Sequence, residues 1–397
     1  MRIVIPENIS KNLELIDSVS LEFDDILQGN VKQLNITKMH ILKMKYANLF
    51  DDSFAKCSYV RYVCKYIDGT QKTFDFESKE HAKYVPLPSA AEACIRINKN
   101  SPYENSVQGR QDCLDQVDKL IEQTLSLSTP NQLGNKTLIY FTVYFDTGYV
   151  ELFDLCVSTL LQNSTVPFDI LVITDIPTQE LIKKTKSASA IDFKYLITDT
   201  PVDGVEASKR KIDIYKYANI QEYACVLFLD CDVIAISKLD KMLRLNLKPD
   251  TIYTARNKKI GYTNFKTIYN GFTCLPDSFV EEMRLAEQLP FNAGQFLFVP
   301  SNVMLKHFEN IRWFMDNWPS EYFFEQCFLS YYFCKSYSTN PFFLQNFVAI
   351  ISTLTPQERE TPTETTCLVH FIAPCLDAKH KTEFIKKFID NNYAILD

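Results

Sequence analysis

Two aspartates within an apolar run are the residues of this sequence best suited to chemistry. The run VLFLDCDVI, residues 226–234, is typical of a buried strand, in which Asp230 and Asp232 project to one side and Cys231 to the other. Two carboxylates a few ångströms apart repel each other by roughly 4 kcal/mol at an effective dielectric constant near 20, so a cation or a proton must lie between them. We therefore predict a divalent metal ion on this pair, with open coordination positions that substrate phosphates fill.

The overall composition limits how such a protein could hold an anionic substrate. The 397 residues include 42 Lys and Arg against 49 Asp and Glu, which gives a net charge of −7 and disfavours nucleic acid as a partner. With only 9 glycines, a Gly-rich phosphate loop is disfavoured as well. A phosphate-bearing substrate must therefore be bound locally, by a metal ion or by a few placed cations.

The cysteines and the apolar runs indicate a compartment. The 12 cysteines form no C-x-x-C pair, so zinc-ribbon spacing is absent and free thiols in a reducing compartment are expected. No apolar run is long enough for a signal peptide or a membrane span. We therefore expect a cytoplasmic protein.

A change of composition divides the chain into two parts. The segment LSLSTPNQLGNKT, residues 125–137, is rich in Ser, Thr, Pro, Asn and Gly, as linkers are. We place a smaller α+β accessory domain at residues 1–130, in which 59–67 begins a hairpin and 89–98 is helical. This part carries no motif to which chemistry can be assigned, so its expected role is docking or oligomerisation.

The second part, residues 138–397, alternates short apolar runs with amphipathic stretches. Strands alternating with helices predict βαβ units, hence an α/β fold with a mostly parallel sheet. Ligands of such sheets bind beyond the carboxyl ends of the strands, and three of the runs end in an aspartate, Asp175, Asp199 and Asp230. The predicted strands are 137–145, 168–175, 193–199 and 225–236.

Four blocks of residues along this second part match a known pattern. In chain order they are Thr142-Val143-Tyr144 with Tyr149 and Ser158; Lys211 with the pair Asp230 and Asp232; Asn292-Ala293-Gly294 within FNAGQFLF, followed by Glu325 and Gln326; and His370-Phe371, followed by Lys379 and Lys381. Over about residues 138–392 these blocks resemble the GT-A fold glycosyltransferases, specifically glycosyltransferase family 8 and its glycogenin-like relatives. The resemblance implies a Rossmann-like domain that transfers sugars from nucleoside diphosphates.

The resemblance also implies a role for each block. The implied nucleotide-binding and donor-binding residues are Thr142, Val143, Tyr149, Lys211, Asn292, Ala293, Gly294, Glu325, Gln326 and, at the diphosphate, Lys379 or Lys381. His370 is the implied third metal ligand beside Asp230 and Asp232. The sequence departs from the family pattern at Ala373, which replaces a glycine, at Glu325, which replaces an aspartate, and in a longer spacing from His370 to the lysines. That spacing leaves the choice between Lys379 and Lys381 open.

The chemistry of the implied ligands favours one metal. His370 closes the apolar run CLVHF and would add a nitrogen to two carboxylates, a mixture that suits Mn²⁺ better than Ca²⁺, with Mg²⁺ as the alternative. Asn292-Ala293-Gly294 offers an amide and small residues, which let the backbone approach a sugar ring closely.

These observations predict a metal-dependent retaining glycosyltransferase. The expected reaction moves a hexose from a UDP-sugar, most simply UDP-glucose, to a hydroxyl of an acceptor that the sequence does not identify. Asp230, Asp232 and Gln326 are the predicted catalytic residues; an amide is a poor nucleophile, so attack from the face that UDP leaves is expected.

Two other functions fit parts of the sequence. A haloacid-dehalogenase-like phosphatase also uses a D-x-D strand, but its strand normally comes first in the domain and a G-D-x-x-x-D segment normally follows. A catalytically silent UDP-binding protein is the other alternative. The sequence indicates neither the donor sugar nor the oligomeric state.

Overall fold

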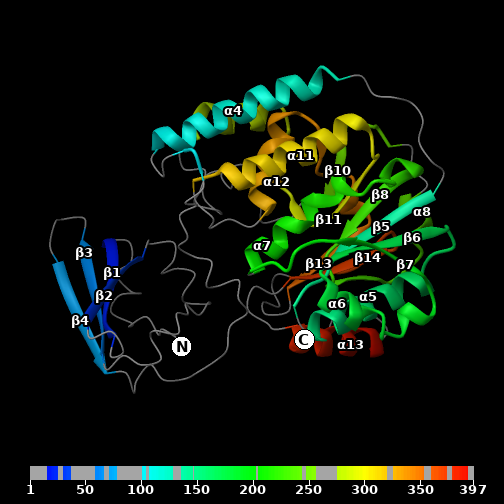
Figure 1. The fold of residues 1–397 in the computed structure, drawn as a ribbon, viewed down its shortest axis with the longest axis horizontal. Helices are drawn as coiled ribbons and strands as arrows, with labels where there is room; N and C mark the ends of the chain where they lie inside the picture. The colour runs from blue at the N-terminus through cyan, green and yellow to red at the C-terminus, as the bar shows by residue number, and fades with distance from the viewer. Residues whose placement is uncertain are drawn as a thin grey trace. The chain divides into compact units, whose positions relative to one another are not determined.

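The structure is a computed structural model, and it describes residues 16–25, 30–36, 59–66, 71–77, 101–103, 107–127, 136–145, 147–202, 204–243, 247–255, 275–319, 325–352, 359–372 and 378–391. The chain forms two compact units, Met1–Cys94 and Ile95–Asp397. Figure 1 traces both along the chain. Within the described residues, no helix is long and apolar enough to cross a membrane.

The first unit contains one antiparallel sheet. Its strands are β1 (Ile16–Asp25), β2 (Asn30–Ile36), β3 (Tyr59–Tyr66) and β4 (Gln71–Glu77), in the order β2-β1-β3-β4. The hairpin predicted to begin at residues 59–67 is present as β3 and β4, which pair Tyr62 with Phe74. The helix predicted at 89–98 lies outside the described residues.

Helix α4 (Val107–Leu125) belongs to the second unit. It contacts α11 (Asn302–Asn317) and α12 (Glu325–Lys335), and it buries Leu114, Val117 and Ile121 in their shared core. The side-chain amide of Asn310 donates to the Thr124 hydroxyl over 2.7 Å. The division between the units therefore lies earlier than the segment 125–137 predicted from composition, because the apolar face of α4 is covered by the second unit.

A seven-stranded sheet forms the centre of the second unit. Its strand order is β12-β10-β11-β8-β5-β6-β7, and β11 is the strand that runs antiparallel to both neighbours. The predicted mostly parallel α/β sheet is thereby confirmed. The strands are β5 (Lys136–Thr142), β6 (Phe168–Thr174), β7 (Phe193–Ile197), β8 (Tyr223–Leu229), β10 (Ile252–Ala255), β11 (Asn292–Phe298) and β12 (Thr339–Asn340).

Alternation along the strands supplies a separate core on each face of this sheet. On β5, Leu138 and Tyr140 join one core while Ile139 and Phe141 join the other. The first core contains residues of α4, α10 (Asp277–Leu285), α11 and α12. The second contains residues of α5 (Thr147–Gln162), α6 (Ile176–Ile182), α8 (Asp240–Leu243) and α13 (Ala378–Asp390).

A smaller, three-stranded sheet contributes to the second core. It contains β9 (Val233–Ala235), β13 (Val348–Ser352) and β14 (Leu368–Ile372), in the order β13-β14-β9. The antiparallel pairing of β14 with β9 sets His370 opposite Val233, one residue after Asp232. Residues far apart in the sequence thus meet at one point.

The sequence predicted one continuous strand at 225–236, but the structure divides this run into two strands. Strand β8 ends at Leu229, residues 231 and 232 form a turn, and β9 then joins the other sheet. The turn is closed by the Val233 amide, which donates to the Asp230 carbonyl over 3.1 Å. Asp230 and Asp232 therefore converge because of this turn, and strand alternation does not place them.

Candidate active site

The two aspartates lie at the carboxyl end of β8, where three strands meet. The Asp230 amide donates to the Gly294 carbonyl of β11 over 2.7 Å, and the Phe371 amide of β14 donates to the Asp232 carbonyl over 3.0 Å. Backbone bonds to two different sheets thus fix the turn. This edge is where ligands of open α/β sheets bind.

Asp230, Asp232 and His370 form a cluster of three possible metal ligands. One ligand atom from each lies within 4.8 Å of the others. Asp232 Oδ1 lies 3.3 Å from His370 Nε2. His370 Nδ1 is buried and has no hydrogen-bond partner in the described part of the chain. Carboxylate oxygens and an imidazole nitrogen fit a divalent transition metal ion.

Gly294 leaves the space that the His370 ring occupies. A Cβ atom built on Gly294 would lie 2.1 Å from His370 Cε1 and 2.7 Å from Nε2. Such distances are far below van der Waals contact, so any larger residue at position 294 must displace the imidazole. The glycine of the Asn292-Ala293-Gly294 block therefore fits directly against the predicted metal ligand.

Lys211 connects one of the aspartates to the opposite wall. Its ammonium lies 3.1 Å from Asp230 Oδ1, 2.6 Å from Glu325 Oε1 and 3.3 Å from the Ala293 carbonyl. Burial lowers the pKa of Lys211, but the Asp230 and Glu325 carboxylates outweigh it and raise the pKa well above its usual value. The side chain is therefore a buried, permanent cation.

Lys381 neutralises the other aspartate. Its ammonium lies 2.6 Å from Asp232 Oδ2, on the first turn of α13. Although burial raises the pKa of Asp232, Lys381 and His370 outweigh it and hold that pKa well below its usual range. Lys379 is exposed and is not among the residues that line the cavity. Of the two lysines that the sequence left open, the structure brings Lys381 to the site.

Asp230 is less fully neutralised than Asp232. Burial raises its pKa, the Lys211 ammonium lowers it, and the nearby Asp232 carboxylate raises it again, with a net increase. Burial and the Asp232 carboxylate both disfavour the charged form of Asp230, so an added positive charge would stabilise it. The imbalance is what a metal ion between the two aspartates would relieve.

Two further hydrogen bonds hold the Asn292-Ala293-Gly294 block, one within the block and one to α12. Asn292 Oδ1 accepts from the Gly294 amide over 2.9 Å, and Gln326 Oε1 accepts from the Ala293 amide over 3.1 Å. Gln326 thereby ties the start of α12 to the start of β11. Its amide oxygen is engaged by the backbone.

A cavity of about 450 Å³ lies over the cluster. The predicted nucleotide-binding and donor-binding residues that line it are Thr142, Tyr149, Lys211, Glu325, Gln326 and Lys381. Those that do not line it are Val143, Asn292, Ala293, Gly294 and Lys379. Val143 is buried in the core, and its amide and carbonyl bond to Ile173 and Thr174 of β6. The lining residues are Thr142, Tyr144, Phe145, Tyr149, Leu152, Gly204, Ala207, Ser208, Lys211, Asp230, Cys231, Asp232, Glu325, Gln326, Ala378 and Lys381.

One wall of this cavity was not predicted from the sequence. Gly204, Ala207 and Ser208 of α7 (Gly204–Lys209) face it together with Lys211. Small residues with helical spacing leave no motif to recognise, so only the 3- and 4-residue spacing back from Lys211 could have indicated them. Of the other aspartates that end predicted strands, Asp175 caps α6 by accepting from the Thr178 amide, and Asp199 is not among the lining residues.

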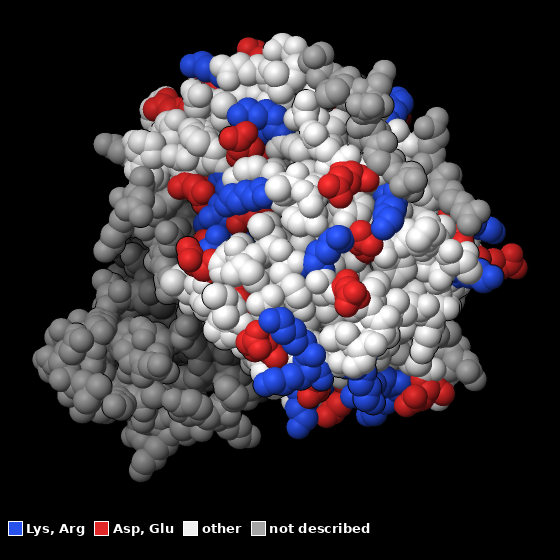
Figure 2. Space-filling view, turned by 45° about the vertical axis from the view of Figure 1, so that its right-hand side comes forward, with Lys and Arg blue, Asp and Glu red and all other residues white. Residues whose placement is uncertain are grey.

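The face of the molecule drawn in Figure 2 has no dominant charge. Figure 2 shows Lys and Arg interspersed with Asp and Glu over the face in view. An anionic ligand approaching this face meets no continuous basic area. Its binding would depend on the buried cations at the site.

Solved glycosyltransferases align with this chain at low identity. The complex of the galactosyltransferase LgtC with donor and acceptor sugar analogues aligns at 13% identity and a TM-score of 0.40, over 62% of this chain and 94% of LgtC. The apo form of mouse xyloside xylosyltransferase 1 aligns at 12% identity and a TM-score of 0.39, over 60% of this chain and 97% of that enzyme. The apo structure of the bifunctional glycosyltransferase WbbM aligns at 11% identity and a TM-score of 0.38, over 62% of this chain and 47% of WbbM. The match thus spans about half of the length of WbbM.

No protein-family model and no curated protein matches the sequence. The aligned structures are glycosyltransferases, the class of enzyme that the motifs resemble.

Proposed function

We propose that this protein is a metal-dependent glycosyltransferase that moves a sugar from a UDP-sugar to a hydroxyl acceptor. The observation that carries the proposal is the convergence of Asp230, Asp232 and His370 within 4.8 Å beside a cavity of about 450 Å³. The buried Lys211 and the largely buried Lys381 each pair with one of these aspartates. This combination suits the diphosphate of a sugar nucleotide, which needs both a metal ion and cations.

Asp230, Asp232 and His370 would hold the metal ion. Their mixed oxygen and nitrogen atoms favour Mn²⁺, with Mg²⁺ as the alternative. When bound, such an ion supplies Lewis-acid stabilisation of the charge on the leaving diphosphate. Lys211 is buried and Lys381 is largely buried, so both would share that charge with little further desolvation.

Glu325 and Gln326 would position the donor sugar. Both line the cavity, Glu325 in an ion pair with Lys211 and Gln326 bonded to the Ala293 amide. Neither is a strong nucleophile in this state, since the carboxylate is paired and the amide is engaged. We propose that the acceptor oxygen bonds to the anomeric carbon on the face that UDP vacates. The bond to the diphosphate breaks, UDP takes its electron pair, and a phosphate oxygen takes the acceptor proton, with retention of configuration.

Thr142 and Tyr149 would contact the nucleoside. They lie at the end of β5 and the start of α5, and Tyr149 is 36% exposed at the cavity. The backbone of Val143 is committed to β6, so its part would be to hold the end of β5 in place. The choice of uridine comes from the motif resemblance. It is the part of the proposal that a nucleotide panel tests first.

The proposal is tested by a thermal-shift panel of UDP, GDP, ADP and inorganic phosphate, each with Mn²⁺ and with EDTA. A ligand at a hundredfold its dissociation constant stabilises the folded state by about 2.7 kcal/mol, which corresponds to several degrees here. We expect a shift with UDP that requires Mn²⁺, followed by turnover of a UDP-sugar.

Two results would contradict this function. A shift with phosphate alone and no nucleotide preference would favour a phosphatase that uses Asp230 as nucleophile. Binding of UDP with Mn²⁺ but no hydrolysis or transfer from any UDP-sugar would favour a silent nucleotide-binding protein.

A further inference from the structure

The helical segment that carries Lys211 has two different faces. Helix α7 (Gly204–Lys209) continues directly into the 3-10 helix η5 (Arg210–Lys216). Gly204, Ala207, Ser208 and Lys211 line the cavity, with spacings of 3, 1 and 3 residues. The same spacing on the opposite side of a helix selects Glu206, Lys209, Arg210 and Asp213.

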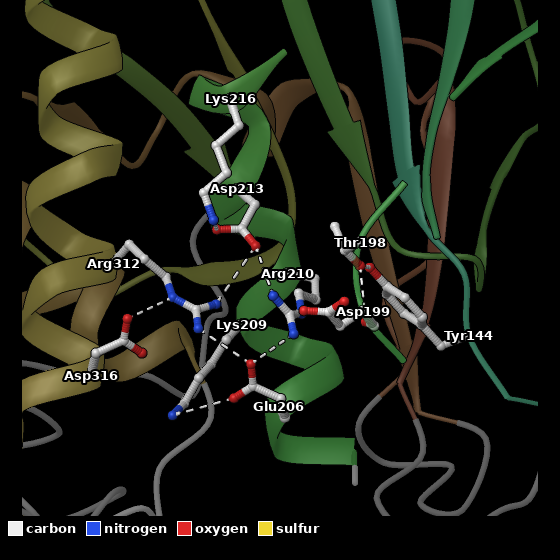
Figure 3. Close-up of polar contacts among 10 residues, drawn as sticks. All are labelled: Tyr144, Thr198, Asp199, Glu206, Lys209, Arg210, Asp213, Lys216, Arg312 and Asp316. Atoms are coloured by element: carbon white, nitrogen blue, oxygen red, sulfur yellow. Dashed lines mark hydrogen bonds and ion pairs between the residues drawn. The ribbon is translucent and has the colours of Figure 1, made fainter. Parts of the chain in front are cut away.

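The face away from the cavity is held in a closed ring of ion pairs, shown in Figure 3. Glu206 Oε1 lies 3.2 Å from a guanidinium nitrogen of Arg210 and 3.2 Å from one of Arg312. Asp213 Oδ2 lies 3.3 Å from Arg210 Nη1 and 3.7 Å from Arg312 Nη1. Each carboxylate therefore joins the same two arginines, and each arginine joins the same two carboxylates.

Arg312 is the member of this ring that comes from elsewhere in the chain. It lies on α11, which packs against η5, and its Nε donates to Asp316 Oδ2 over 2.9 Å. The Arg312 side chain is 14% exposed and that of Asp213 is fully buried. A planar guanidinium with several fixed donors holds two carboxylates in one geometry, which a single ammonium cannot do.

We propose that Arg312 is a positioning residue for the donor-binding pocket: by holding Glu206 and Asp213, it fixes the rotation of the α7–η5 segment and so the placement of Lys211 and of the small-residue wall. This inference rests on the proposed function and adds to it a residue that touches neither donor nor metal ligands. A small rotation of the segment about its axis would move Lys211 away from Asp230. It would also displace Ala207 and Ser208, which form one wall of the cavity. Donor affinity would therefore depend on α11.

The test is the dissociation constant of UDP with saturating Mn²⁺, measured by calorimetry, together with hydrogen–deuterium exchange of residues 204–216. Arg312→Met keeps the length of the side chain and removes every donor. We expect this variant to bind UDP at least tenfold more weakly and to exchange faster in 204–216, with residues 378–391 unchanged. The matched control is Lys306→Met on the same helix, which breaks an exposed pair with Glu309 and should change neither reading.

A second variant separates positioning from stability. In Glu206→Gln/Arg312→Met the ring loses one charge of each sign, so no net charge is added and the melting temperature should recover. The tether is still absent, so UDP binding should stay weak. If Arg312→Met does not fold, Asp316→Asn loosens the Arg312 guanidinium from an exposed carboxylate, and a weakening of about threefold is expected.

Three results would overturn the inference, and they are distinguishable. If the unaltered protein does not bind UDP with Mn²⁺, the proposed function fails and this inference falls with it. If the unaltered protein binds UDP and Arg312→Met binds it within twofold, only the positioning role is wrong. If UDP affinity recovers in parallel with the melting temperature in the double variant, the ring is structural and does not position the pocket.

Discussion

Two charged regions lie on opposite sides of the α7–η5 segment, and they are built from different cations. The ring on the α11 side uses Arg210 and Arg312, each shared between the same two carboxylates (Figure 3). In the cavity the cations are Lys211 and Lys381, and each pairs with one of the two aspartates. The ring is closed on itself, whereas the cavity cluster opens on a space that a ligand can enter.

The difference follows from the chemistry of the two side chains. A guanidinium is planar and holds carboxylates through several donors at fixed angles, so an arginine ring resists rearrangement. An ammonium is a compact charge on a flexible stem, and it can leave one oxygen for another at little geometric cost. The arginine ring is therefore suited to hold the backbone in one geometry. The lysines of the cavity can change partners when a metal ion and a diphosphate bind.

The largest effect should come from removing one charge on each side of the segment. Asp230→Asn keeps the shape of a metal ligand and removes its charge, so kcat should fall roughly a thousandfold, as expected for several kcal/mol of lost Lewis-acid stabilisation. Its melting temperature should hardly change, because Lys211 keeps Glu325 as a partner. Activity with a UDP-sugar and a thermal melt provide the two readings.

The matched variant in the ring is Asp213→Asn. Breaking the ion pair between the fully buried Asp213 carboxylate and the largely buried Arg210 costs about 3 kcal/mol, so the melting temperature should fall by several degrees. Because the ring is proposed to set donor affinity, kcat at saturating donor should stay within about threefold. Retained activity in Asp230→Asn would contradict the metal assignment. Equal losses of stability in both variants would remove the distinction between the two regions.

Gly294→Ala tests whether the pocket depends on close packing as well as on charge. The added methyl would lie 2.1 Å from His370 Cε1, so the imidazole must move away from Asp232. We expect Mn²⁺ affinity to fall by roughly tenfold to a hundredfold, the usual cost of disturbing the support of a metal ligand. Mn²⁺ binding can be followed by electron paramagnetic resonance without any substrate.

A double-mutant cycle shows whether Gly294 acts through His370. If it does, His370→Ala and the double variant Gly294→Ala/His370→Ala should bind Mn²⁺ equally weakly, because the second change has nothing left to displace. Additive losses would mean that the methyl harms the site by another route.

The sequence predicted the main architecture because its signals are local. Apolar runs alternating with helical stretches indicated the βαβ units, and the strands at 137–145, 168–175, 193–199 and 225–236 correspond to β5, β6, β7 and β8. The break after Leu229 was missed because the flanking apolar residues continue through it, whereas the turn and the pairing of β9 with β14 that follows it depend on tertiary contacts. The division at Cys94 was missed for the same kind of reason: the composition of 125–137 does not report which unit α4 packs against.

The site was predicted where spacing along the chain carries the information. Asp230 and Asp232 are two residues apart, and Gly294 was noted for close approach, although its contact with His370 is a tertiary fact. The ring around Arg312 could not be predicted, because Arg312 is 106 residues from Glu206 and neither lies in a recognisable motif. Charge partners at that separation are fixed by packing, which a single sequence does not show.

Lys381 and Lys379 provide a smaller and more specific test of exchangeable charge. Lys381→Met removes the ammonium 2.6 Å from Asp232 Oδ2, so that oxygen becomes free for the metal ion. Without nucleotide, Mn²⁺ should bind roughly threefold to tenfold more tightly, and UDP in the presence of Mn²⁺ should bind more weakly by a similar factor, about 0.7 to 1.4 kcal/mol. Lys379→Met, two residues away and exposed, should change neither constant.

Two results with these lysine variants would contradict the view that the charge of Lys381 is exchangeable. Weaker Mn²⁺ binding in Lys381→Met would mean that the ammonium helps to organise the aspartates and does not compete with the ion. Equal effects of the two substitutions would point to a general loss of positive charge near the cavity.

The smallest effect is expected at His307, a buried titratable group that forms no ion pair within the part of the chain that the structure describes. It lies on the buried face of α11, with Nδ1 3.4 Å from the Tyr332 hydroxyl and its ring 5.7 Å from that of Phe333. Burial lowers the pKa of His307 to about 4 from an ordinary 6.5, against a weak opposing effect of Asp250. In contrast to the ring and the cavity cluster, this site holds its group neutral.

The sign of the pH dependence follows from that depressed pKa. Below pH 6.5 His307 binds a proton in the unfolded chain, whereas in the folded protein it stays neutral down to about pH 4. The free energy of unfolding therefore falls as the pH falls through this window. Between pH 7 and pH 5.5 the loss from this residue should be about 1 kcal/mol. Urea unfolding of the unaltered protein and of His307→Gln, which keeps a hydrogen-bonding group near Tyr332, measures the difference. The Asp232 carboxyl does not confuse the reading, because its pKa lies far below the window. If both proteins lose the same stability between these two pH values, His307 is protonated in the fold, and the rule that buried charges here require an opposite partner is wrong.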